Sequence, residues 1–143
     1  MSFLLDTNVV SEWVRQRPDA GVVAWLAEAD EDRVFISVVT LAELRYGIER
    51  LTAGQRRRRL DEWLKDELPL RFEGRVLPID AAIADAWGRL TASREAAGRP
   101  IAVADAFIAA TAEVHGFALV TRNVSDFDAT VKAVVNPWTD GRH

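Results

Sequence analysis

The 143-residue chain contains no cysteine and only two histidines, His115 and the terminal His143. The absence of cysteine excludes disulfides, thiolate-bound zinc or iron–sulfur centres and a cysteine nucleophile. Two histidines give little support for a Ser-His-Asp triad or a histidine-rich metal site. His115 stands beside Gly116 at a predicted helix end, where compensation of the helix dipole is its simplest role.

Long apolar runs are also missing, and none approaches the ~20 residues that a bilayer-spanning helix needs. The N-terminus has no basic segment, and Asp6 interrupts its apolar stretch, so we expect no signal peptide. Together with the lack of cysteine, this predicts a cytoplasmic protein without a membrane partner. The net charge of -4 argues mildly against a nucleic-acid binder, although a carboxylate cluster at a metal site would itself lower the charge.

Apolar stretches alternate with segments of helical periodicity, and no β-hairpin signal separates them. This alternation predicts an α/β fold with a central, mostly parallel sheet of about four to five strands, in one domain spanning residues 1–143. Helices around Gly54 predict an αα-hairpin. The expected strands are 3–5, 34–39, 76–79, 117–121 and 131–135, and the expected helices are 9–15, 20–29, 40–51, 55–68, 81–97 and 105–114.

Acidic residues follow several of these strands or begin the helices beside them. Asp6 follows the first strand, Glu43 lies one turn into the helix after the second, and Asp105 begins a later helix. Each has an ordinary alternative: Asp6 caps a helix, Glu43 completes a capping box with Thr40, and Asp105 complements a helix dipole. In a parallel sheet, however, these places converge on one edge. Capping does not explain why the carboxylates should meet there.

Several carboxylates in one crevice repel one another unless a cation neutralises them. Hard oxygen ligands select Mg²⁺ or Mn²⁺ over zinc. Such an ion activates water and stabilises displacement at a phosphodiester. The residues alone therefore predict a divalent-metal phosphoryl hydrolase. A phosphatase that forms an aspartyl-phosphate fits poorly, because Asn8 breaks the Asp-x-Asp pair.

Four ordered motifs then make the prediction more specific. They are LLDTNVVSE at residues 4–12, ISVVTLAELRYG at 36–47, IAVADAFIAATA at 101–112 and LVTRNVSDF at 119–127. Together they resemble the motifs of PIN domains, in the family's order and over nearly the whole chain. The subgroup they are most similar to is the VapC toxins of type II toxin–antitoxin modules, in particular FitB-like members, whose C-terminal pattern VNPW at 135–138 also matches.

The resemblance implies a PIN-like three-layer fold and a Mg²⁺- or Mn²⁺-dependent endoribonuclease, which hydrolyses RNA phosphodiester bonds with metal-activated water. It also implies a homodimer inhibited by a cognate VapB- or FitA-like antitoxin, with tRNA or rRNA as substrate and with DNA contacted only through the antitoxin. An alternative is a subunit acting mainly in a DNA-binding repressor complex, with weak or no nuclease activity.

The same resemblance assigns roles to individual residues. Asp6, Glu43 and Asp105 correspond to the family's metal ligands, and either Asp126 or Asn123 completes the site, with Asp126 preferred because Asn123 is neutral. The hydroxyls of Thr7 and Thr121, with Asn8, are expected to support the site.

Two surface features remain open at this point. Arginines 56–59 form either a solvated helix face or an RNA contact, in which Arg56 and Arg57 would be joined by Arg94 and Arg99. The apolar face of the αα-hairpin, around Leu44, Ile48 and Trp63, is expected to serve as a groove for the antitoxin or the dimer partner.

Overall fold

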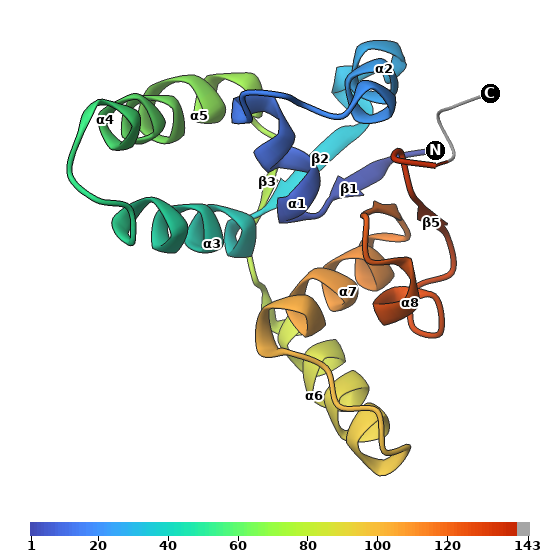
Figure 1. Ribbon diagram of the computed structural model, residues 1–143. Helices are drawn as coiled ribbons and strands as arrows, with labels where there is room; N and C mark the ends of the chain where they lie inside the picture. The colour runs from blue at the N-terminus through green and yellow to red at the C-terminus, as the bar shows by residue number, and fades with distance from the viewer. Residues whose placement is uncertain (140–143) are drawn as a thin grey trace.

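The computed structural model describes residues 1–139, and His143 lies outside that range (Figure 1). Within residues 1–139, no helix is both long enough and apolar enough to cross a membrane. The elements, in chain order, are β1 Phe3–Leu5, α1 Thr7–Val10, η1 Ser11–Val14, α2 Ala20–Glu28, η2 Glu31–Arg33, β2 Val34–Ser37, α3 Val38–Glu49, α4 Gln55–Glu62, η3 Trp63–Glu67, α5 Leu68–Arg71, β3 Val76–Leu77, α6 Ala81–Ala96, α7 Val103–His115, β4 Ala118–Val120, α8 Val124–Phe127 and β5 Val134–Val135.

The five strands form a sheet in the order β3-β2-β1-β4-β5, and every neighbouring pair is parallel. Phe3 of the central strand β1 is in register with Val34 on one side and Ala118 on the other. The predicted α/β class and parallel sheet are thus confirmed. The short strand β3 lies at an edge, where Pro78 after it removes no ladder hydrogen bond.

Helices cover both faces of this sheet, which gives the expected three layers (Figure 1). Side chains alternate along a strand, so Leu4 and Leu5 of β1 enter different cores. Leu5 joins the core beneath α1, α2, η3 and α5, whereas Leu4 joins the core beneath α6, α7 and α8. Both side chains are fully buried. This two-sided burial explains why the strands read as continuous apolar runs.

Several predicted boundaries differ from the structure. The second strand ends at Ser37 rather than residue 39, because the Ser37 hydroxyl accepts a hydrogen bond from Val39 N and starts α3 there. The last strand contains only Val134–Val135, since residues 131–132 form a bend and residue 133 lies outside the strand. The first helix begins at Thr7 and changes to a 3₁₀ turn at Ser11. The helix predicted to start at Asp105 begins two residues earlier, at Val103.

The second helix of the αα-hairpin continues beyond the predicted end at Leu68. Helix α4 passes through the π-helical turn η3 into α5, which ends at Arg71. Pro69 is tolerated because it stands at the start of α5, where its missing N–H costs little. The hairpin protrudes from the sheet as expected, with α3 as its other arm (Figure 1).

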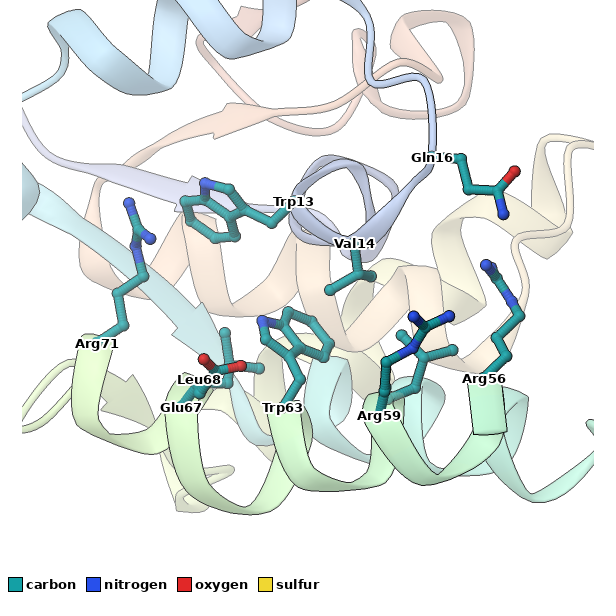
Figure 2. A pocket seen from close by; sticks show the side chains of 10 residues that line it. Trp13, Val14, Gln16, Arg56, Arg59, Trp63, Glu67, Leu68 and Arg71 are labelled. Carbon is teal, nitrogen blue, oxygen red and sulfur yellow. The ribbon is translucent and has the colours of Figure 1, made fainter. Parts of the chain in front are cut away.

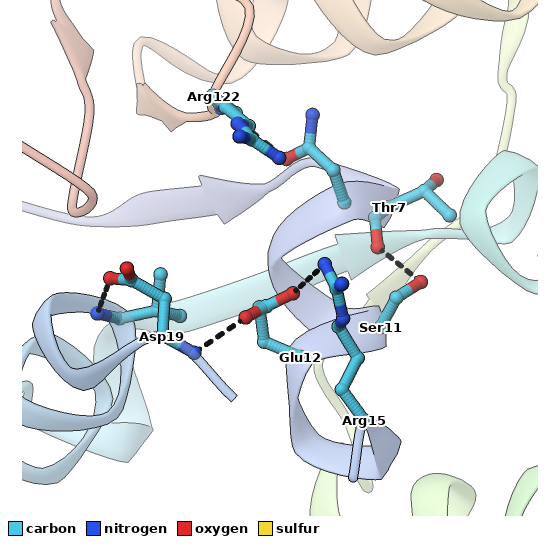
Figure 3. Close-up of polar contacts among 8 residues, drawn as sticks. Thr7, Ser11, Glu12, Arg15, Asp19 and Arg122 are labelled. Carbon is cyan, nitrogen blue, oxygen red and sulfur yellow. Dashed lines mark hydrogen bonds and ion pairs between the residues drawn. The ribbon is translucent and has the colours of Figure 1, made fainter. Parts of the chain in front are cut away.

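The turn after α1 is fastened by a buried carboxylate, Glu12, which is 3% exposed. Its Oε1 accepts from Asp19 N at 2.8 Å, and its Oε2 lies 3.1 Å from Nη1 of Arg15 (Figure 3). Ser11 Oγ donates to the Thr7 carbonyl at 2.9 Å. These bonds tie η1 to the start of α2 and so fix α1, whose first residues belong to the site described next.

Candidate functional site

The strand order reverses direction between β1 and β4, the two neighbouring strands from which the chain builds outward to either side. In open α/β sheets, the crevice beyond the carboxyl ends of such strands is the usual place for a ligand. Asp6 follows β1 there, and Thr121 follows β4. The two are joined by a hydrogen bond, in which Thr121 Oγ1 donates to Asp6 Oδ2 at 2.8 Å.

Asp6 is 4% exposed, and its carboxylate is held on both sides. Oδ1 accepts from Thr7 N at 2.8 Å, which makes Asp6 the N-cap of α1, while Oδ2 accepts from Thr121. Burial raises the pKa of Asp6 to about 6, and the negative charges of Asp105 and Glu43 add to the effect of burial. Asp6 therefore caps α1, and both its burial and the charges of Asp105 and Glu43 disfavour its ionised form.

Glu43 is directed to the site by Thr7. Thr7 Oγ1 lies 2.5 Å from Glu43 Oε1 and 3.2 Å from Thr40 Oγ1, so one hydroxyl links α1 to α3. The capping-box interpretation of Glu43 is wrong, because Ser37 is the N-cap of α3 and Glu43 bonds to Thr7 instead. Thr40 is fully buried in this contact.

Asp105 completes the cluster from the first turn of α7. Partial burial is the main cause of its raised pKa, and the charges of Glu43 and Asp126 raise the pKa further. The cap residue Ala102 provides no side-chain hydrogen bond, so Asp105 is the polar group of this helix start. Asp105 and Glu43 thus raise the pKa of Asp6, and Glu43 and Asp126 raise the pKa of Asp105, as convergence at one sheet edge predicts.

Asn123 and Asp126 differ in how they approach the cluster. Asn123 N donates to Thr121 Oγ1 at 3.0 Å, which ties its backbone to the site, whereas its side chain makes no hydrogen bond that caps α8. Asp126, one turn later in α8, raises the pKa of Asp105 by its charge. Asn8 supports the centre, with Nδ2 lying 3.5 Å from Asp6 Oδ2 and 3.4 Å from Thr121 Oγ1.

The donors at this edge are carboxylate and hydroxyl oxygens, which suit a hard divalent cation and not a thiolate-seeking one. Burial and neighbouring carboxylates raise the pKa values of Asp6 and Asp105, so a cation placed between them would favour their ionised forms. Within residues 1–139, no three or more histidine, cysteine, aspartate or glutamate side chains are arranged so that they could hold a metal ion. The donor types fit a cation, but the side chains would have to close on it.

The four arginines predicted to bind RNA are in different situations. Arg57 pairs with Glu49 at 2.8 Å, and Arg94 donates to the carbonyls of Arg99 and Asp126 and to Thr130. Arg94 thereby fixes the segment that carries Asp126. Arg99 lies beside it, with Nη2 3.5 Å from the Ser125 carbonyl. Arg56 faces an open pocket on the hairpin.

That pocket has a volume of about 510 Å³ and lies between η1 and the second arm of the hairpin (Figure 2). Trp13 and Trp63 supply its aromatic wall, while Arg56, Arg59 and Arg71 bring positive charge. Neither Arg56 nor Arg59 forms an ion pair with the described residues, 1–139. The π-helical turn begins at Trp63, and such turns are frequent at functional sites. Leu44 and Ile48, predicted to line this groove, are instead buried in the core.

Comparisons with known proteins identify the family of this chain. The family model described as "PIN domain" matches residues 3–132. The chain is 41% identical to "Toxin FitB" of Neisseria gonorrhoeae over 137 residues, which cover 96% of this chain and 99% of that toxin. It is 39% identical to "VapC ribonuclease Y4jK" of Sinorhizobium fredii, with 94% of this chain and 96% of that protein covered.

A solved structure is similar over the same length. The chain superimposes on one chain of "Structure of FitAB bound to IR36 DNA fragment" with a TM-score of 0.88 and 39% identity, covering 95% of each chain.

Proposed function

This chain belongs to the PIN-domain family, as a VapC-type toxin, and from that premise we propose that it is an endoribonuclease of a toxin–antitoxin module. The observation that carries the proposal is the electrostatic coupling of Asp6, Glu43 and Asp105 at the carboxyl edge of the sheet. The substrate would be RNA, in the form of tRNA or rRNA, and the working form a homodimer. Cleavage of purified RNA that continues in EDTA would contradict the proposal.

We propose Asp6, Glu43 and Asp105 as the ligands of a Mg²⁺ or Mn²⁺ ion, with Asp126 as the fourth acid. When bound, such an ion activates water and stabilises charge that develops on the phosphate. The protein supplies the orientation: Thr121 and Thr7 hold the two oxygens of Asp6, and Thr7 also holds Glu43. Asp126 is preferred over Asn123 because its charge reaches Asp105.

Thr7→Val removes the hydroxyl that links α1 to Glu43 and keeps the volume of the side chain. We expect a 10- to 100-fold loss of RNA cleavage, roughly the usual effect of losing a group that orients a metal ligand. Thr7→Ser is the matched control, because it retains the hydroxyl and should retain most of the activity. Initial rates measured with a fluorogenic RNA would decide, and equal losses in both variants would contradict the orienting role.

The partner in this proposal is a cognate antitoxin. One relative of known structure is part of a complex, FitAB, which is bound to DNA. We assign the antitoxin contact of this chain to the pocket lined by Trp13, Trp63, Arg56 and Arg59, because its aromatic wall and unpaired arginines suit an amphipathic segment with acidic side chains.

Arg59→Glu should weaken antitoxin binding at least about tenfold, since it places a like charge opposite the acidic side chains of the partner. Arg89→Glu is the control, because Arg89 pairs with exposed Asp85 on α6, away from this pocket. Calorimetric titration of toxin with antitoxin measures both. An unchanged dissociation constant for Arg59→Glu would move the antitoxin contact elsewhere.

The alternative of a binding subunit without nuclease activity is not favoured. A relative 39% identical over nearly the full length is itself named a ribonuclease, and a purely binding role gives no reason for carboxylates to be placed where they repel one another. A toxin can still take part in a repressor complex through its antitoxin, so the two roles are compatible.

A further inference from the structure

Two arginines near the carboxylates are held against aromatic rings and form no ion pair with the described residues, 1–139. The guanidinium carbon of Arg50 lies 5.3 Å from the ring centroid of Tyr46, and Arg50 Nη1 donates to the Tyr46 hydroxyl at 3.3 Å. The guanidinium of Arg122 lies 5.5 Å from the ring of Trp138. A ring orients a guanidinium and leaves its N–H donors available.

These arginines lie on opposite sides of the carboxylates. Arg50 is the C-cap of α3, seven residues after Glu43, which places it on the same helix face about 10 Å farther out. Arg122 directly follows Thr121, the residue bonded to Asp6. Because β1 lies between β2 and β4 in the sheet, the segments that follow β2 and β4 lie on either side of the segment that follows β1.

The other arginines that contact aromatic rings also form an ion pair or donate to backbone carbonyls. Arg71 lies 4.2 Å from the Trp13 ring but pairs with Glu31 at 2.8 Å. Arg75 lies over Phe72 and donates to three backbone carbonyls. Arg50 and Arg122 differ from these arginines because a ring orients each guanidinium while no carboxylate within residues 1–139 pairs with it. Tyr46 itself is 64% exposed, so the contact with Arg50 lies at the surface.

We propose that Arg50 and Arg122 bind the two RNA phosphates that flank the scissile phosphate, one on each side of the carboxylates. This inference rests on the proposed ribonuclease function and adds to it the path along which a single RNA strand would bind across the sheet edge. Charge complementarity supports an RNA strand as the occupant, because Arg50 and Arg122 have no ion pair within residues 1–139 and each can therefore bind one phosphate. Guanidinium groups oriented in advance lose less entropy on binding phosphate.

Binding of a fluorescein-labelled single-stranded RNA of twelve uridines, measured by anisotropy in EDTA between 20 and 200 mM salt, tests the inference without cleavage. Arg50→Ala and Arg122→Ala should each lower affinity about three- to tenfold. Each should also flatten the slope of log K against log salt by about 0.7, the value for one phosphate contact on a single strand. The double variant should lose about 1.4.

Arg33→Ala is the matched control, because Arg33 pairs with Asp30 at 3.9 Å in η2, before the start of β2 and so at the opposite edge of the sheet. Arg33→Ala should change the affinity and the salt slope by less than Arg50→Ala or Arg122→Ala does. Tyr46→Leu should lower affinity while the slope is retained, since the charge of Arg50 remains and only its orientation is lost. A merely structural role of Tyr46 or Arg50 would not separate affinity from slope in this way.

Slopes unchanged in both arginine variants would overturn the inference, as would an antitoxin-binding defect with normal RNA binding. The inference and the proposed function fail in different ways. If slopes fall as expected but the wild type cuts no RNA with Mn²⁺, the phosphate contacts stand and the ribonuclease proposal fails. If the wild type cuts RNA and the variants have unchanged kcat/KM, the phosphate contacts are wrong and the ribonuclease stands.

Discussion

Asp105→Asn is expected to reduce Mn²⁺-dependent RNA cleavage by more than about 100-fold while the protein remains folded. Substitutions of groups that merely support a metal ligand cost about 10- to 100-fold, so loss of a ligand's charge should cost more. Asp105 is half-buried in the first turn of α7, and the amide keeps its shape. The measurement is a single-turnover cleavage rate, with circular dichroism to check the fold.

Glu113→Gln is a suitable control for this variant, because Glu113 lies on the same helix two turns away at an exposed position. It should cleave RNA at the wild-type rate. A folded Asp105→Asn protein with a rate within a few-fold of wild type would remove Asp105 from the machinery and weaken the proposed metal site.

Asp6→Asn should have two opposite effects: higher stability without metal and loss of stabilisation by metal. Burial raises the pKa of Asp6 from 3.8 to about 6, so the folded state disfavours its ionised form. The folded state then binds more protons than the unfolded state, and the free energy of unfolding falls as pH rises between these two values. At pH 7.5 the difference in pKa corresponds to about 3 kcal/mol, which the neutral amide should recover in large part.

Thermal unfolding at several pH values measures this. In EDTA at pH 7.5, the Tm of Asp6→Asn should exceed that of the wild type by roughly 5–10 °C. The two proteins should become alike as pH falls through about 6 toward 3.8, where Asp6 is protonated. Mn²⁺ should raise the Tm of the wild type and leave Asp6→Asn unchanged. Asp66→Asn, an exposed substitution in η3, serves as the control. A lower Tm for metal-free Asp6→Asn would contradict the account in which the folded state disfavours the ionised form of Asp6.

The parts of this site that could be predicted from sequence depend on local order. A short apolar run that ends in Asp6 must leave the sheet at its carboxyl edge, and the same holds for β4 and Thr121. Convergence of the acids therefore followed from strand direction, before any side-chain contact was known. The resemblance to PIN-domain motifs then indicated which of these acids to propose as metal ligands.

Other parts depended on contacts between distant segments and could not be predicted. The hydroxyl of Thr7 reaches Glu43 across 36 residues, and this contact decided against the capping box. The run of arginines 56–59 gave no sign that Arg57 would pair with Glu49 while Arg56 faced a pocket. The sequence did not single out Arg122, because its contact with Trp138 joins the segment after β4 to the segment after β5.

The measurement that tests the central claim most directly is a map of the cuts that purified, antitoxin-free protein makes in total RNA with Mn²⁺. Sequencing of the fragment ends would locate the cuts, with EDTA and Asp6→Asn as parallel controls. We predict discrete cuts in tRNA or rRNA that disappear in both controls. The same cuts in EDTA or with Asp6→Asn, or no cuts at a Mn²⁺ concentration that raises the wild-type Tm, would contradict a metal-dependent ribonuclease built on these carboxylates.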